Sequence, residues 1–205
     1  MEKFTHHSGV TATLLQPNID TDAIIPSREM KLVSKQGLGE GLFAYWRYTE
    51  AGGREPNPEF ILNQSSYANT SILLTGVNFG CGSSREHAVW ALSEYGIRAI
   101  IAPSFGAIFY GNCVRNGILP IVLDEDHVKN LARAAADDTQ NHQLSIDLES
   151  CVISTPDGNS TSFEIEESHR HMLLNGLDSV ALTQQLESTI REFEASDKIN
   201  RSWLY

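Results

Sequence analysis

The sequence predicts an α/β fold with a central, mostly parallel sheet and flanking helices. Three short apolar segments are predicted as buried strands, at residues 70–76, 97–103 and 118–123. A stretch with apolar residues at helical spacing separates each of these strands from the next. Strands that alternate with helices form parallel sheets, because each crossover helix returns the chain to the same end of the sheet. Hydrophobic residues make up 41% of the 205 residues, which is enough for a core and excludes global disorder.

The N-terminal third is less regular. Residues 8–15 alternate small or polar with apolar side chains, which predicts a strand. Residues 16–28 are rich in Pro, Asn and Asp and are predicted as a loop. A short helix is expected at 40–48, and residues 51–59 form the clearest irregular segment.

The central motifs lie between the predicted strands. A glycine-rich turn is expected at 78–84, followed by a helix at 84–95. A second helix is predicted from 105 to 115 and ends at Gly117. Asp124 is placed to cap a third helix.

The C-terminal part has a different pattern. Residues 144–155 and 161–167, with the turn sequence TPDGNS between them, predict β-hairpins at a sheet edge. Residues 167–175 and 178–196 are predicted helices separated by Gly176. The last seven residues, INRSWLY, either dock on the body or are disordered. We expect one domain over residues 1–205, with a helical extension from about 167.

The charge distribution limits the partners. The net charge of −11 argues against nucleic acid as the main ligand. Residues 124–205 hold 16 acidic and 6 basic side chains, so an anionic ligand is better received by the first half of the chain. The sequence has no run of about 18 apolar residues, so no membrane helix is predicted. The N-terminal segment also lacks the apolar region of a secretory signal. We therefore expect no membrane partner and a cytoplasmic protein.

The cysteines narrow the chemistry further. Cys81, Cys113 and Cys151 are odd in number and widely spaced. This spacing excludes a disulfide framework, a CxxC redox pair and a complete metal site made of thiolates. We expect reduced thiols and no metal bound by this chain.

The turn at residues 80–87, GCGSSREH, carries the strongest chemical signal. Its small residues let the backbone approach a ligand closely, and the following helix N-terminus presents N–H groups to an anion. Arg85 could hold a carboxylate with two parallel hydrogen bonds, beside the hydroxyls of Ser83 and Ser84. The alternative is structural: Ser83 to Glu86 also fits a capping box, and His87 is more often a structural histidine than a base.

Two further groups are weaker. Residues 18–22, NIDTD, suit an Asx-rich turn, or a loop that presents a carboxylate to orient a catalytic group. His169 and His171 lack a third ligand at a sensible spacing and are taken as surface residues.

Three motifs in the same order resemble a known family. They are NIDTD at 18–22, GxNFGCGSSREHA at 76–88 and SFGxIFxxNxxxNGxLPI at 104–121. Together they resemble the small subunits of 3-isopropylmalate dehydratase and the C-terminal swivelling domain of aconitase, over roughly residues 1–190. The resemblance implies a swivelling β/β/α domain that closes over a separate large subunit.

The resemblance also implies an activity. The large subunit would carry a [4Fe–4S] cluster, and this chain would bind no cofactor. The reaction would isomerise 2-isopropylmalate, a small dicarboxylate, to 3-isopropylmalate through 2-isopropylmaleate in leucine biosynthesis. On the family pattern Ser83 matches the base, as an alkoxide, Ser84 and Arg85 match carboxylate-binding residues, and Asp22 matches a residue thought to orient active-site groups.

Substrate choice is expected to depend on the segment after NIDTD. Met30 and Leu32 would suit an isopropyl group, or are core residues instead. Lys31 lies in the same segment and is also expected to bind substrate, although its role and that of Arg28 are ambiguous. The alternatives are a related hydro-lyase acting on citraconate, dimethylmalate or homoaconitate, a non-catalytic anion-binding module, and a purely structural subunit.

Overall fold

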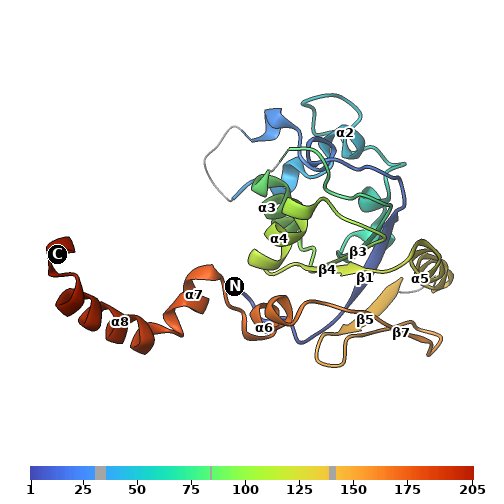
Figure 1. The fold of residues 1–205 in the computed structure, drawn as a ribbon. Coiled ribbons are helices and arrows are strands. Elements are labelled where there is room, and N and C mark those ends of the chain that lie inside the picture. The colour runs from blue at the N-terminus through green and yellow to red at the C-terminus, as the bar shows by residue number, and fades with distance from the viewer. Residues whose placement is uncertain (31–35, 84, 139–141) are drawn as a thin grey trace.

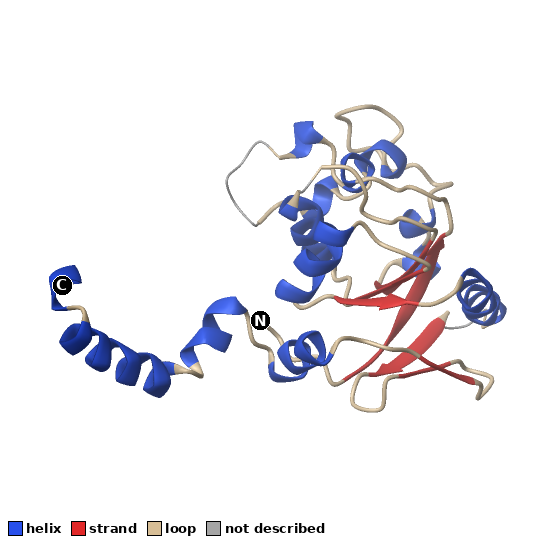
Figure 2. Cartoon of the chain, in the orientation of Figure 1, coloured by secondary structure: helices blue, strands red, loops and turns tan. Residues whose placement is uncertain are grey.

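A computed structural model of the chain describes residues 1–30, 36–83, 85–138 and 142–205. Its described strands form one sheet of seven, in the order β4-β3-β2-β1-β5-β6-β7 (Figures 1 and 2). The strands are β1 (His6–Leu14), β2 (Thr70–Thr75), β3 (Ala99–Ala102), β4 (Leu119–Val122), β5 (Gln143–Asp147), β6 (Val152–Ser154) and β7 (Ser160–Ser162).

The sheet has a parallel and an antiparallel half. Strands β1 to β4 pair in parallel, with Leu73 of β2 opposite Ile100 of β3 and Ile100 opposite Pro120 of β4. Strands β5, β6 and β7 pair antiparallel, and β5 joins them to β1. The predicted α/β class, its parallel centre and the hairpins at the edge are confirmed. That the chain is a single domain stays a prediction.

Eight described α-helices accompany the sheet, and their order matches the predicted alternation in the centre of the chain. They are α1 (Thr21–Ile24), α2 (Ala44–Arg47), α3 (Glu86–Tyr95), α4 (Ala107–Arg115), α5 (Glu125–Asp137), α6 (Glu167–Asn175), α7 (Ser179–Gln184) and α8 (Glu187–Asn200). Asp124 caps α5 as predicted, because its side chain accepts a hydrogen bond of 2.9 Å from the His127 N–H.

Both faces of β2, β3 and β4 are mostly buried, which explains the apolar character of these three strands. Ile72 and Leu74 of β2 face one core, which includes side chains of α5 and α6. Leu73 faces the other core, which includes side chains of α1 and α3 and, from α4, Phe109 and Cys113. In Figure 1, α3 and α4 lie above the sheet and α6 lies below it.

Two local predictions were wrong in detail. Residues 16–28 contain the helix α1 and a 3-10 helix, Ser27–Glu29, rather than only a loop. Asp20 makes the short helix possible, because its side chain accepts a 2.7 Å hydrogen bond from the Ala23 N–H. The helix expected at 40–48 is limited to α2, since Phe43 adopts a left-handed φ of 48° just before it.

The C-terminal segment extends away from the body. The single helix expected at 178–196 is two helices, α7 and α8, with Leu186 between them. Both helices project outward in Figure 1. The last residues neither dock on the sheet nor lack structure: Ser202–Leu204 form a 3-10 helix, and the Tyr205 hydroxyl donates to Asp197 Oδ2 at 3.0 Å. Within the described ranges, no helix combines the length and apolarity needed to cross a bilayer.

Candidate active site

The glycine-rich turn after β2 is shaped by close contact with α4. Gly80 has a φ of 70°, and a Cβ there would lie 2.2 Å from Cγ of the Phe109 ring. Gly106 directly precedes α4 and lies against the same turn, since a Cβ on Gly106 would be 2.6 Å from the Gly80 carbonyl oxygen. Side chains are therefore excluded at both positions, and the start of α4 packs directly against the turn.

The NIDTD segment is joined to this turn by backbone contacts. The Gly80 N–H donates to the Ile19 carbonyl at 2.7 Å, and the Thr21 N–H donates to the Cys81 carbonyl at 3.0 Å. The Thr21 hydroxyl also donates to the Ser83 carbonyl at 3.0 Å. Two motifs some sixty residues apart in the chain thus form one structure.

A cavity of about 320 Å³ opens at this junction. Arg85 is the only charged side chain among the described residues that line it, which are Thr21, Asn78, Gly80, Cys81, Gly82, Ser83, Arg85, Gly106, Ala107, Ile108, Phe109 and Asn112. The first residues of α4 and the residues just before α3 belong to this lining, so the N-termini of both helices face the cavity. One guanidinium and two helix N-termini make the cavity suited to an anion.

Asp22 and Arg85 form the main ion pair of the site. Arg85 Nη1 donates to Asp22 Oδ1 at 2.6 Å, and the Ser27 hydroxyl donates to the same oxygen at 3.1 Å. The hydrogen bond from Arg85 lowers the pKa of the Asp22 carboxyl. Asp22 therefore stays ionised and holds one edge of the guanidinium, while the other donors of Arg85 are not used by this contact.

Ser83 is an exposed residue on the cavity wall. The capping-box interpretation of Ser83 was wrong: the residue that precedes α3 is Arg85, and it makes no side-chain cap. The reason is that α3 begins only at Glu86, and Thr21 holds the Ser83 backbone in the turn through the Ser83 carbonyl. Ser84 lies outside the described residues.

The histidines do not enter the cavity. His87 packs its ring on Trp90, with 4.8 Å between the ring centroids, and is absent from the described cavity wall. His169 Nδ1 lies 3.5 Å from Glu166 Oε2, and His171 is exposed. In the described ranges, no three His, Cys, Asp or Glu side chains gather as a metal site. The three cysteines are unpaired, and burial raises the pKa of the Cys113 thiol.

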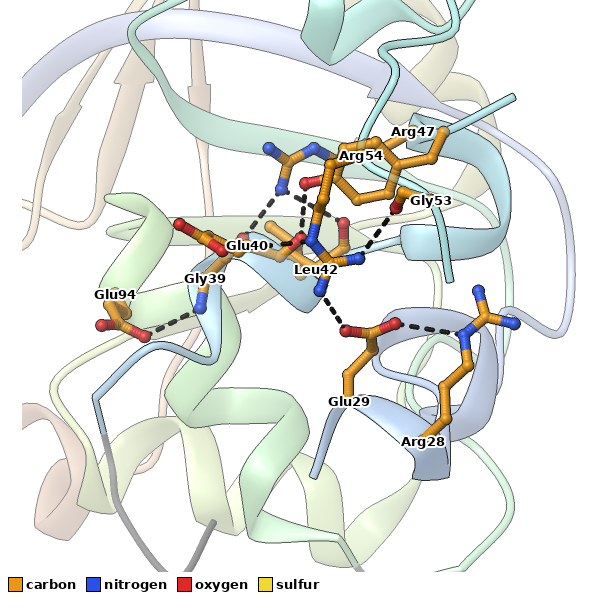
Figure 3. Close-up of polar contacts among 10 residues, drawn as sticks. Arg28, Glu29, Gly39, Glu40, Leu42, Arg47, Gly53, Arg54 and Glu94 are labelled. Carbon is orange, nitrogen blue, oxygen red and sulfur yellow. Dashed lines mark hydrogen bonds and ion pairs between the residues drawn. The ribbon is translucent and has the colours of Figure 1, made fainter. Parts of the chain in front are cut away.

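The segment proposed for substrate choice is anchored by a separate ionic cluster (Figure 3). Glu29 accepts from Arg54 Nη2 at 2.6 Å and from Arg28 Nε at 3.1 Å. Burial opposes ionisation of Glu29, but these two hydrogen bonds outweigh it and lower the pKa of that carboxyl. Met30 follows directly and packs half-buried against the core that contains α3, away from the described cavity wall. Lys31 and Leu32 lie outside the described residues.

The sequence of this chain is similar to those of known proteins. The family model described as "Aconitase C-terminal domain" matches residues 1–126, and a second model, LeuD_N, matches residues 132–167. A protein of Cupriavidus necator named 3-isopropylmalate dehydratase small subunit is 56% identical over 205 residues, which is all of this chain and 99% of the relative. A protein of the same name from Agrobacterium fabrum is 50% identical, over 99% of this chain and all of that protein.

The chain belongs to the family of 3-isopropylmalate dehydratase small subunits.

A solved structure of this family shows the same fold. It is the 3-isopropylmalate dehydratase from Methanocaldococcus jannaschii, which is 25% identical to this chain, with a TM-score of 0.66. The alignment covers 92% of this chain and 99% of the solved one. The α/β class and the resemblance inferred from three motifs are therefore confirmed, while the roles of individual site residues stay predictions.

The structure of the present chain also shows site residues that the sequence analysis did not predict. Asn78 and Asn112 line the cavity, and neither was among the predicted site residues. Asn112 had a detectable signal: it shares a buried helix face with Phe109 and Cys113, where a polar side chain is unexpected.

Proposed function

We propose that this chain is the small subunit of the hydro-lyase that isomerises 2-isopropylmalate to 3-isopropylmalate through 2-isopropylmaleate in leucine biosynthesis. The observation that carries the proposal is the cavity where Ser83 and Arg85 meet the NIDTD segment, in a chain of this family. The cavity offers a hydroxyl, a guanidinium and two helix N-termini to a small dicarboxylate.

Arg85 binds a substrate carboxylate in this proposal. Asp22 occupies Nη1 and fixes the plane of the guanidinium, so its remaining N–H groups are presented in one orientation. Ser84, which has the matching place in the motif, is proposed to bind the same carboxylate. The N–H groups at the starts of α3 and α4 add positive potential around the bound anion.

Ser83 acts as the base. As an alkoxide it takes the proton from the substrate carbon next to a carboxylate, and the hydroxyl on the neighbouring carbon departs. A serine hydroxyl is a weak base, and the positive potential of Arg85 and the helix N-termini favours its deprotonated form. In the return step Ser83 gives the proton back, and water adds in the opposite sense.

The other half of the active site belongs to a large subunit. Three scattered cysteines, one of them buried, do not fit a cluster site in this chain. We propose that a [4Fe–4S] cluster belongs to the large subunit, where it would supply a Lewis acid for the hydroxyl that departs. The small-molecule dicarboxylate is then bound between the two chains. Nucleic acid and membrane have no part in this function, and the reduced cysteines suit a cytoplasmic enzyme.

Reconstitution tests the function. The chain is produced alone and together with a 3-isopropylmalate dehydratase large subunit, and the two preparations are assayed for interconversion of 2- and 3-isopropylmalate. We expect turnover only from the pair. Turnover by the purified chain alone would refute the division of the active site. Activity of the pair on citraconate, dimethylmalate or homoaconitate instead would assign it to a related hydro-lyase.

A further inference from the structure

Asn112 is a polar side chain in a buried place. It lies in the middle of α4 with only 5% of its surface exposed, yet it belongs to the wall of the cavity that holds Ser83 and Arg85. Its neighbours on the same helix face, Phe109 and Cys113, pack into the core. A buried amide normally satisfies its donors and acceptor within the protein, so the partners of Asn112 indicate its role.

Arg115 determines which way the amide of Asn112 points. Arg115 Nη2 lies 2.5 Å from Asn112 Oδ1. A guanidinium only donates hydrogen bonds, so the Asn112 atom that faces it must be the oxygen. The amide nitrogen Nδ2 therefore points away from Arg115. Across the described ranges, Nδ2 donates to no protein acceptor. This nitrogen is also not completely enclosed by protein atoms. It is thus open to the cavity.

The backbone around Asn112 is also held firmly. The Asn112 carbonyl accepts a 2.9 Å hydrogen bond from Asn116 Nδ2, which also donates to Glu86 Oε1 at 2.9 Å. Trp90 Nε1 donates to Asn116 Oδ1 at 3.1 Å. These contacts join α3 to α4 beside the cavity. The amide of Asn112 is therefore presented from a rigid element, as a binding group should be.

We propose that Asn112 is a substrate-binding residue whose Nδ2 donates to a substrate carboxylate oxygen, and that Arg115 is its positioning residue. The inference rests on the proposed function and adds to it. Arg85 and Asn112 are then two donors on the same cavity wall. The Asn112 donor is built into the fold, because the Arg115 contact prevents the amide from turning its oxygen toward the anionic ligand.

The test uses the reconstituted two-subunit enzyme with 2-isopropylmalate. Asn112→Asp keeps the shape and the oxygen that faces Arg115, but replaces the cavity-facing NH₂ with an oxygen. Loss of a hydrogen bond to a charged group predicts a rise in KM of about 10-fold to 100-fold, to which repulsion between carboxylates adds. Arg115→Met frees the amide to turn and is expected to raise KM about threefold to tenfold, a part of the same effect. Arg115→Lys keeps a donor and should restore most of the affinity.

A matched control lies on α5. Arg133 Nη1 donates to Asn130 Oδ1 at 3.2 Å, which is the same three-residue spacing on an exposed helix surface. Asn130→Asp and Arg133→Met should leave KM unchanged. Melting temperature and subunit assembly are measured for every variant, because a merely structural role of Asn112 would lower these without raising KM.

The outcomes separate the two hypotheses. If the wild-type pair converts 2-isopropylmalate and Asn112→Asp keeps the wild-type KM, the Asn112 inference is overturned and the proposed function stands. If Asn112→Asp does not assemble, Arg115→Met decides, since Arg115 is exposed and its replacement spares the core. An unchanged KM there overturns the inference. If the wild-type pair shows no turnover, both proposals fail.

Discussion

Replacing Arg85 with lysine tests how the cavity binds a carboxylate. In the wild type, Nη1 of Arg85 is occupied by Asp22 Oδ1 at 2.6 Å, and the other guanidinium donors remain for substrate. Lysine keeps the positive charge but has one compact ammonium group. It can pair with Asp22 or with the substrate, and it cannot present two parallel N–H groups to either.

The expected magnitude follows from the lost contact. One hydrogen bond to a charged group contributes about 1.5–3 kcal/mol, and about 1.4 kcal/mol corresponds to a tenfold change in affinity. Arg85→Lys should therefore raise the KM for 2-isopropylmalate about 10-fold to 100-fold. The melting temperature should change little, because both partners of the ion pair are partly exposed and such pairs contribute under about 1 kcal/mol.

The assay is steady-state turnover of 2-isopropylmalate by the reconstituted enzyme. Arg98→Lys is the control, because Arg98 pairs with the exposed Glu2 at 3.0 Å and lies outside the described cavity wall. If Arg85→Lys retained both the wild-type KM and the wild-type kcat, Arg85 would not be a carboxylate ligand, and the anion would have to be held by the remaining groups of the cavity, which are Ser84, Asn112 and the helix N-termini.

Two further predictions concern selectivity and pH. The wild-type pair should turn over 2-isopropylmalate and reject citrate, because Arg85 is the one charged side chain on the described cavity wall and burying a third carboxylate without a partner costs several kcal/mol; comparable kcat/KM values for the two acids would contradict the assignment. Asp22→Asn should lower the melting temperature of the chain by about 1–3 °C near neutral pH. Since the folded pKa of Asp22 lies below its ordinary value of 3.8, this difference should persist down to that pH and disappear as the pH falls through the folded pKa; a constant difference at all pH values would argue against the ion pair.

The sequence predicts the sheet well because burial on both faces leaves a simple signal. β3 is an unbroken apolar run, β2 has three consecutive apolar residues at its centre, and Gly96 ends the helix α3 that separates the two strands. The antiparallel edge is equally easy to predict from the sequence, since a turn sequence lies between β6 and β7. The residues that cap the helices were harder to predict from the sequence. Asp20 caps a helix inside a segment that was predicted as a loop. Ser83 does not cap α3, although the sequence fits a capping box there.

The site required tertiary structure. Asp22 and Arg85 are 63 residues apart, and only the pairing of the NIDTD segment with the glycine-rich turn brings them to 2.6 Å. The motif resemblance pointed to both residues without showing that they touch. Asn112 was overlooked because it is one asparagine in a helix, and its role depends on Arg115 and on a cavity that no local pattern encodes. Met30 was predicted to bind substrate because it is apolar and follows the NIDTD motif, but in the structure it packs against the core.

The central claim, that Ser83 is the base, is tested most directly by the solvent-exchange behaviour of Ser83→Ala. Since Ser83 does not cap α3, the variant should melt like the wild type, assemble with the large subunit and still bind substrate through Arg85. Loss of a general base predicts a fall in kcat of about 10²–10⁴-fold. Exchange of the carbon-bound proton of the substrate with solvent deuterium should fall to the same extent. If Ser83→Ala kept wild-type exchange and turnover while folded and assembled, Ser83 would not be the base, and the proton would have to be taken by a side chain of the large subunit.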